Sequence, residues 1–394
     1  MLHVFGGLKS LFSLSVNGPK PETESSISKL HYRVTAIVFL VCCVLVTSVE
    51  YVGNGTTIAC VQDGHPDYWP IPAHVMNTYC FIMGTFTLPK HFAGEIGKDV
   101  IHPGVGEYNK ERDEMQYKAY YQWVPFVLFL QACLFYVPHA LFKVAEGGKV
   151  GGIISGLHQT EAEVHDDERG GRHKILAKYF MKCVNTHNLW ALKMLICELL
   201  TLANVIGNIY FIDTFLGGEF SSYGLQVASF VEDDPQNRID PMSRVFPRMT
   251  KCLYQKYGPS GSIQTHDALC MLPINVINEK IYVFIWFWLI FLAVITTLSV
   301  LYHLILIISP STLSHMIKRR LRHKDGISDI LDDITNNFQF GDWKLLHILA
   351  YNMTPVIFGE FVLELDTQLG EKEQAELPPN DSNANLRKPL LTPI

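Results

Sequence analysis

The sequence predicts an all-α membrane protein with four transmembrane helices, cytoplasmic N and C termini, and disulfide-braced extracellular loops containing some β structure. Three observations support this prediction. Four runs of the chain approach the roughly 20 apolar residues that a membrane crossing needs. Charged residues make up only 18% of the 394 residues, against about 25% in soluble domains. Four of the nine cysteines fall, two and two, in the expected outside loops.

The four spans are assigned to residues 34–52, 120–142, 187–216 and 280–308. The third is the least apolar. The fourth is the clearest, because residues 281–308 contain no Asp, Glu, Lys or Arg. The alternative is a soluble protein with a large buried core, but soluble helices seldom sustain a charge-free run of that length.

The placement of Lys and Arg predicts the orientation of these spans. With the N-terminus inside, the cytoplasmic segments 1–33, 143–186 and 309–394 together hold 20 of the 32 basic residues. The outside loops 53–119 and 217–279 hold 10. Cytoplasmic loops of membrane proteins carry the excess of basic residues, so both termini are expected inside.

The C-terminal part divides by composition. Residues 309–366 mix apolar and charged residues, and we expect them to form a helical cytoplasmic dome with part of the loop 143–186. Residues 367–394 are polar and rich in proline, which predicts a disordered tail.

Cysteine placement fits this topology. Cys60 and Cys80 lie in the first outside loop, and Cys252 and Cys270 lie in the second. An even number in each oxidising loop predicts a disulfide framework, whereas the other five cysteines should stay reduced. Four cysteines allow three pairings, and spacing does not choose among them. Two unrelated thiols per loop remain the alternative.

A polar stripe runs along the third span. Glu198, Thr201, Asn204 and Asn208 fall within an arc of roughly 120° at helical spacing. Such a stripe must face protein or water. Either it lines a wet vestibule, or it hydrogen-bonds a neighbouring helix, which we favour.

Two prolines fall inside the second span. Pro125 and Pro138 each remove a backbone donor, so both are kink candidates. A kink serves either as a gating hinge or as a fixed feature of the helix's shape, and we favour the second.

Composition and motifs argue against other function classes. The net charge of −6 does not fit a nucleic-acid binder. The chain has no HExxH, GxSxG, CxxC or GxGxxG motif. We therefore predict no enzyme, no catalytic residue, no metal site and no cofactor.

One short motif points to a family. The segment Tyr120-Tyr121-Gln122-Trp123-Val124 resembles the YYQWV signature at the outer end of the second helix of innexins, the invertebrate gap-junction subunits. Tyr and Trp favour the membrane interface, which fits that position. Residues 219–224, 240–247, 256–262, 278–282 and 341–343 also resemble the family, especially its insect members. The resemblance covers residues 1 to about 365.

The resemblance implies a structural subunit of gap junctions in the plasma membrane. Several subunits would form a ring, alone or with other innexin chains, and two rings on neighbouring cells would dock. The channel would pass ions and small molecules. In this family the two outside loops are tied together, which implies Cys60–Cys270 and Cys80–Cys252.

The resemblance also implies that the N-terminal segment and the first helix line the pore. Leu2, His3, Val4 and Phe5 are the pore-mouth candidates. A loose cytoplasmic tail is the alternative for this segment.

Two other functions stay open for the whole chain. One is an undocked hemichannel, like the related pannexins, that releases metabolites from single cells. The other is an adhesion or scaffold protein with four spans and no pore. Docking itself is implied by the resemblance and by no single residue.

Overall fold

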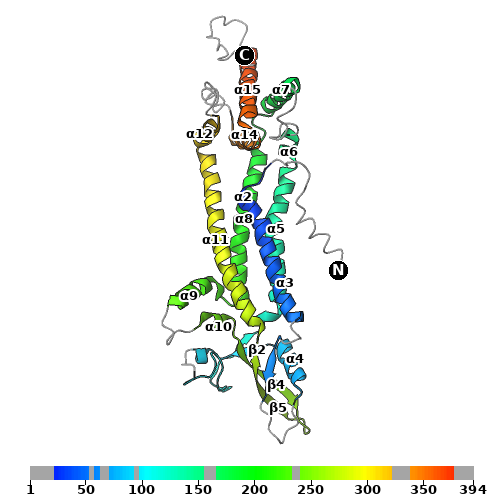
Figure 1. Ribbon diagram of the computed structural model, residues 1–394, viewed down its shortest axis with the longest axis vertical. Coiled ribbons are helices and arrows are strands. Elements are labelled where there is room, and N and C mark those ends of the chain that lie inside the picture. The colour runs from blue at the N-terminus through cyan, green and yellow to red at the C-terminus, as the bar shows by residue number, and fades with distance from the viewer. Residues whose placement is uncertain are drawn as a thin grey trace. The chain divides into compact units, whose positions relative to one another are not determined.

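Four long helices carry the runs that the sequence assigns to the membrane (Figure 1). The computed structural model describes residues 22–52, 57–62, 71–92, 97–154, 166–232, 240–321 and 338–376. Within these ranges, four helices are long and apolar enough to span a bilayer: Ser26–Val49, Val124–Glu146, Asn188–Phe215 and Ile274–Ile308. The last three are α5, α8 and α11. The first combines α2 (Ser26–Lys29), a π-helical turn η1 (Leu30–Thr35) and α3 (Ala36–Val52).

The first helix begins earlier than residue 34. Ser25 is its N-cap, and its hydroxyl accepts a hydrogen bond from the backbone N–H of Ser28 at 3.1 Å. A serine in this position satisfies a backbone donor that would otherwise lack a partner. The polar residues 26–33 are therefore helical, although their composition placed them outside the span.

The two prolines of the second span occupy different positions. Pro125 is the second residue of α5, in the first turn, where a backbone N–H has no intrahelical partner. The kink expected there is wrong, because proline is tolerated at a helix start. Pro138 lies inside α5, so a kink at that position stays a prediction.

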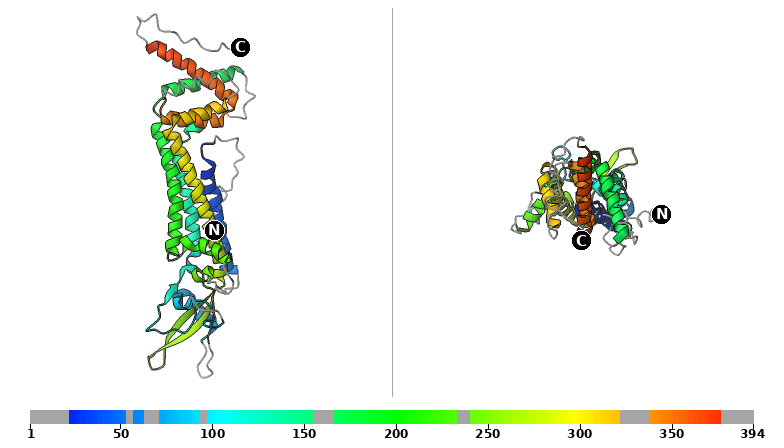
Figure 2. Two further views of the ribbon diagram at one scale, coloured as in Figure 1. Left: turned by 90° about the vertical axis from the view of Figure 1, so that its left-hand side faces the viewer. Right: turned by 90° about the horizontal axis from the view of Figure 1, so that it is seen from above.

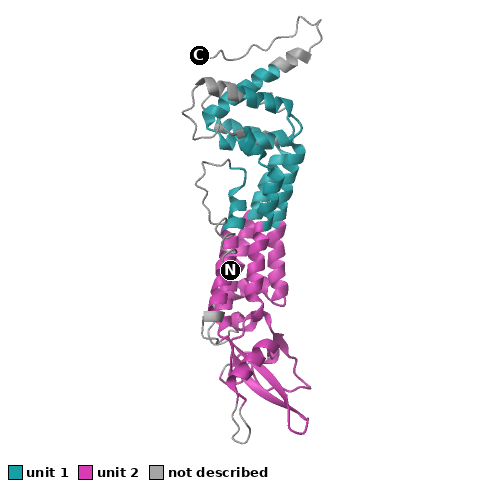
Figure 3. Ribbon diagram, turned by 90° about the vertical axis from the view of Figure 1, so that its right-hand side faces the viewer, with its two compact units in different colours: residues 1–33, 137–202, 296–394 teal, residues 34–136, 203–295 magenta. Residues whose placement is uncertain are grey.

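The chain forms two compact units (Figure 3). Unit 1 comprises residues 1–33, 137–202 and 296–394, and unit 2 comprises residues 34–136 and 203–295. Each of the four spans contributes residues to both units.

A five-stranded antiparallel sheet organises one end of unit 2. Its strand order is β1-β5-β4-β2-β3. The second loop supplies the central hairpin, β4 (Met249–Tyr257) and β5 (Ile263–Met271). The first loop supplies β1 (Ala59–Val61) on one side, and β2 (Thr85–Thr87) and β3 (Gln116–Lys118) on the other. The hairpin of one loop is thus held between strands of the other.

Short helices complete unit 2: α4 (Ala73–Met83), η2 (Pro89–Phe92), η3 (Tyr120–Gln122), α9 (Phe220–Glu232) and α10 (Pro241–Val245). α9 packs closely on α11. The Trp286 indole N–H of α11 donates to the Ser221 carbonyl of α9 at 3.2 Å. A Cβ on Gly224 would lie 2.1 Å from the Trp286 ring, so this approach requires glycine.

Unit 1 contains five further helices within its described residues: α6 (Lys149–Ile154), α7 (Asp166–Lys182), α12 (Pro310–Arg320), α14 (Phe340–Asn352) and α15 (Pro355–Glu376). α15 packs against α7, and α14 packs against α6 and α12 (Figures 1 and 2). Their core includes the fully buried side chains of Phe180, Leu345 and Phe361. Within the range 309–366, the described residues 310–320, 340–352 and 355–366 are helical, and residues 322–337 lie outside the described part of the chain.

The boundary of the C-terminal tail differs from the prediction. α15 continues to Glu376, so residues 367–376 are helical and not disordered. Glu, Gln, Lys and Ala are good helix formers, and the first proline of this stretch is Pro378. Residues 377–394 lie outside the described part of the chain.

Candidate functional site

Two disulfides join the outside loops. Cys60 on β1 pairs with Cys270, its direct partner across the ladder on β5. Cys80 on α4 pairs with Cys252 on β4. The pairing implied by the family resemblance is confirmed. Each bridge closes a long loop, separated by 210 and 172 residues, which strongly limits the unfolded chain.

The same cysteines form the cluster of potential metal ligands found among the described residues. The sulfur atoms of Cys60, Cys80 and Cys270 lie within 4.8 Å of one another. All three are in disulfides, so they have no thiolate to offer a metal.

The Tyr120–Val124 segment closes the end of α4. The Tyr121 hydroxyl lies 3.4 Å from the Cys80 carbonyl oxygen and 3.5 Å from that of Phe81. The Gln122 side-chain amide donates to the carbonyls of Phe81 and Ile82. The last carbonyls of a helix have no intrahelical donor, so these side chains satisfy them. The signature thus supports the helix that carries Cys80.

The aromatic residues of this segment differ in solvent exposure. Trp123 is 60% exposed, as an interface aromatic should be, whereas Tyr121 is 3% exposed. Burial raises the pKa of Tyr121 to about 12 and raises that of Tyr120 well above its ordinary value. The sequence did not predict that Tyr121 is buried against α4. A tyrosine next to a membrane span has the same sequence pattern at the membrane interface and in the protein interior.

Several family-like stretches meet at Phe246. The ring centroids of Tyr120, Tyr223 and Tyr282 lie 5.5, 5.8 and 5.2 Å from that of Phe246. These rings come from the second span's entry, α9 and α11. One aromatic cluster therefore joins segments that are far apart in the sequence.

A buried carboxylate lies beside this cluster. The Glu279 side chain is 1% exposed and pairs with the Arg248 guanidinium at 2.8 Å. The Tyr223 hydroxyl donates to the Glu279 carbonyl oxygen at 3.2 Å. Burial, reinforced by the negative charge of Glu279, raises the pKa of Tyr223.

Two residues of the polar stripe on α8 donate hydrogen bonds within their own helix. The Thr201 hydroxyl donates to the Cys197 carbonyl at 2.9 Å. The Asn208 amide donates to the Asn204 carbonyl at 2.8 Å. Glu198 differs, because its carboxylate pairs with residues of α11 and α14.

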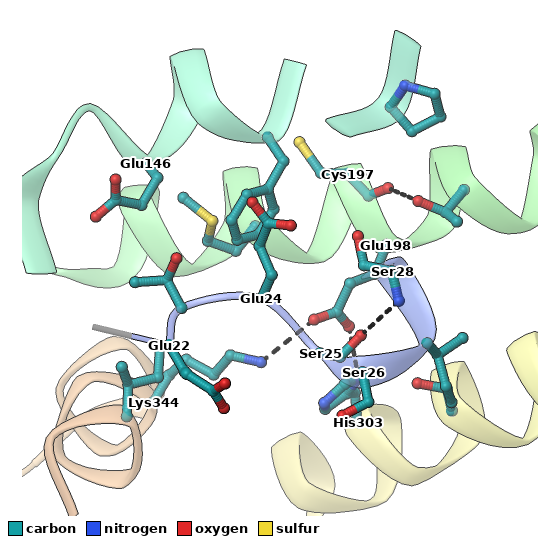
Figure 4. A pocket seen from close by; sticks show the side chains of 18 of the residues that line it. Glu22, Glu24, Ser25, Ser26, Ser28, Glu146, Cys197, Glu198, His303 and Lys344 are labelled. Carbon is teal, nitrogen blue, oxygen red and sulfur yellow. Dashed lines mark hydrogen bonds and ion pairs between the residues drawn. The ribbon is translucent and has the colours of Figure 1, made fainter. Parts of the chain in front are cut away.

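A cavity of about 200 Å³ in unit 1 contains Glu198 in its wall. Residues 22–28, α5, α8, α11 and α14 all contribute to this wall. Glu198 Oε2 lies 2.6 Å from His303 Nδ1 on α11, and Oε1 lies 3.5 Å from Lys344 Nζ on α14. Figure 4 shows the Glu198 and Lys344 side chains pointing toward each other.

The pore-mouth candidates Leu2, His3, Val4 and Phe5 lie outside the described residues. Their role in lining a pore stays a prediction.

Comparison with known proteins gives a consistent result. The family model for Innexin matches residues 24–369. The chain is 43% identical to Innexin inx2 of Drosophila melanogaster over 383 residues, covering 97% of this chain and 100% of the fly protein. It is 43% identical to Innexin inx2 of Schistocerca americana, covering 95% and 99%. It is 39% identical to Innexin shaking-B of Drosophila melanogaster, covering 96% and 98%.

Proposed function

Because the chain belongs to the innexin family, we propose that it is a structural subunit of gap junctions in the plasma membrane. Several copies, or copies mixed with other innexin chains, form a ring around an aqueous pore. Rings on adjacent cells dock through the loops that carry the disulfides. The channel passes ions and small molecules between cells.

The observation that carries this proposal is the interleaved sheet. β4 and β5 of the second loop lie between β1 and β2 of the first, and two disulfides lock them. The two loops therefore fold as one covalently linked sheet. A surface that must match its counterpart on another cell gains affinity from such preorganisation, because little conformational freedom is lost on docking.

The disulfides also support the orientation. Two loops that are joined covalently lie on the same side of the membrane. Disulfides persist in oxidising surroundings, so that side is the outside. Since the loops follow the first and third of four spans, both chain ends are cytoplasmic, in agreement with the Lys and Arg distribution.

Dye transfer between paired expressing cells tests the function. We expect a small dye to pass between cells that both express the chain. Uptake into single cells without transfer would indicate an undocked hemichannel. Neither transfer nor uptake, with the protein at the cell surface, would indicate a scaffold without a pore.

Cysteine variants test the role of the sheet. Cys80→Ser with Cys252→Ser should abolish dye transfer, because α4 and β4 lose their covalent link. Cys183→Ser is the matched control, since Cys183 is a free thiol outside the sheet. Equal transfer by both variants, at equal surface expression, would contradict the proposal.

A further inference from the structure

The cavity in unit 1 has features of a ligand site that the channel function does not explain. It is lined by four helices and by residues 22–28, and it is partly open. Its volume of about 200 Å³ exceeds the roughly 150 Å³ of an engineered cavity that binds benzene. A molecule with one six-membered ring and a short side chain therefore fits.

Negative charge predominates in the cavity wall. Glu22, Glu24, Glu146 and Glu198 contribute carboxylates, whereas Lys344 is the single lysine among the lining residues. Lys29 pairs with Glu22 at 2.9 Å from outside the wall. Including Lys29, four carboxylates stand against two lysines, and His303 and His347 also line the cavity. This lining favours a cationic ligand over an anionic one.

Three of these carboxylates have close partners. Both oxygens of Glu146 accept backbone N–H groups, from Gly148 at 2.7 Å and Val150 at 2.9 Å. Glu22 binds Lys29, and Glu24 Oε2 lies 3.2 Å from His139 Nδ1. A ligand that bound any of these three carboxylates would have to displace its present partner.

Glu198 is the carboxylate best placed to accept a ligand. Its side chain is 20% exposed, and Oε1 is 3.5 Å from Lys344 Nζ. A charge-assisted N–H···O bond is normally about 2.7–2.9 Å long. Oε1 thus has room for a closer cation, while Oε2 remains held by His303 at 2.6 Å (Figure 4).

The remaining wall offers an apolar surface. Phe142, Met194, Val300 and Ile348 line the cavity beside the charged groups. Trp190 adds an aromatic ring that is 7% exposed. Small-molecule sites commonly combine an apolar wall with a few polar groups that fix orientation.

We propose that this cavity binds a small organic cation, a primary ammonium group on a single-ring apolar body, with the ammonium on Glu198. The ammonium displaces that of Lys344 and donates to Glu198 Oε1. The ring lies against Met194 and Val300. The proposal is independent of whether the channel docks.

The test measures binding to the purified full-length chain in lipid nanodiscs by isothermal titration calorimetry. The probe is 2-phenylethylammonium. Phenylacetate is the matched anion of similar shape, and empty nanodiscs correct for partition into lipid. We expect the cation to bind and phenylacetate to bind at least tenfold more weakly.

Two variants should change affinity in opposite directions. Glu198→Gln should weaken binding of 2-phenylethylammonium on the order of tenfold or more, because a charge-assisted hydrogen bond becomes neutral. Lys344→Met should strengthen it, because the competing ammonium is removed. General damage to the fold would instead weaken binding of the cation in both variants. Glu107→Gln and Lys110→Met, at exposed positions of unit 2, are the matched controls.

A third variant covers the case in which Glu198→Gln fails to fold. Ser299 lines the cavity, so Ser299→Phe fills it without changing charge and should abolish binding. The proposal is overturned if the wild-type chain does not bind the cation or if phenylacetate binds equally well. It is also overturned if the folded Glu198→Gln or Ser299→Phe variant binds as the wild type does.

Discussion

Asp342 and His187 form a hydrogen-bonded pair with no solvent exposure: Asp342 Oδ1 lies 2.7 Å from His187 Nδ1, and both side chains are 0% exposed. The second carboxylate oxygen accepts the backbone N–H of Asn185 at 2.8 Å. Asn185 has a positive φ of 66°, which a non-glycine residue adopts mainly when its surroundings hold it. Asp342 thus fixes the turn that precedes α8.

Removing this carboxylate should destabilise unit 1. Asp342→Ala leaves a buried His187 ring nitrogen without its partner and removes the acceptor of the part-buried Asn185 N–H. The buried unsatisfied nitrogen costs about 1–3 kcal/mol and the part-buried hydrogen bond about 0.5–1.5 kcal/mol, so we expect a loss of about 2–4 kcal/mol. Thermal unfolding of the purified chain measures it. Glu114→Ala, at an exposed position, is the control and should lie within about 0.5 kcal/mol of wild type. Equal melting of the two variants would refute the role of Asp342.

Gly341 should not tolerate a side chain. A Cβ at this position would lie 2.3 Å from the His187 carbonyl carbon and 2.4 Å from the Asn188 nitrogen. Both are backbone atoms, so Gly341→Ala forces α14 away from the start of α8 and should lower the yield of folded protein. Gly370→Ala is the matched control, because a Cβ there meets nothing within 4 Å. In helix α15 that change should be neutral or stabilise by about 0.5–1 kcal/mol. Size-exclusion chromatography measures the yield of folded protein for the two variants. A normal profile for Gly341→Ala would contradict the prediction.

Gln122 should matter through its hydrogen-bond donors. Gln122→Glu keeps the shape of the side chain but places a carboxylate against the carbonyls of Phe81 and Ile82. A negative charge is unfavourable at the C-terminal end of a helix. We expect α4 to lose protection in hydrogen exchange, corresponding to about 1–3 kcal/mol. Gln116→Glu on an exposed position of β3 is the control. Unchanged protection of α4 in Gln122→Glu would show that these donors are dispensable.

The buried tyrosines predict a loss of stability at high pH. Tyr121 has its pKa raised from 10.0 to about 12 by burial. Between those values the unfolded chain loses the phenol proton while the folded chain keeps it, so stability falls as pH rises. The contribution is fully present below pH 10 and declines above it. Urea unfolding at pH 9 and at pH 11, compared with Tyr121→Phe, measures it. The variant should show a smaller decline, and an equal decline would contradict the assignment.

Part of the site followed from short-range patterns. Four spans, the orientation of the loops and the even distribution of Cys60, Cys80, Cys252 and Cys270 depend on composition along the chain, which hydropathy and charge report directly. The pairing of these cysteines needed the family resemblance, because spacing leaves three pairings open.

Predictions from local sequence patterns were wrong where the role of a residue depends on where its helix begins or on which residues it contacts. Pro125 looked like a kink, but α5 begins at Val124, so its missing N–H has no effect on the helix. Tyr121 looked like an interface aromatic, but it caps α4. The members of the polar stripe differ: Thr201 and Asn208 donate to their own helix, whereas Glu198 pairs with His303 on α11.

By itself, then, the sequence determined the membrane class, the topology and the family, because the free energy of membrane insertion is summed over each segment independently. The tertiary structure decided which residues meet: Cys60 with Cys270, Asp342 with His187, and Glu198 with Lys344 across the cavity wall. These contacts join residues at least 146 positions apart. The free energy of such a contact depends on distance, burial and orientation in space, and no local pattern encodes them.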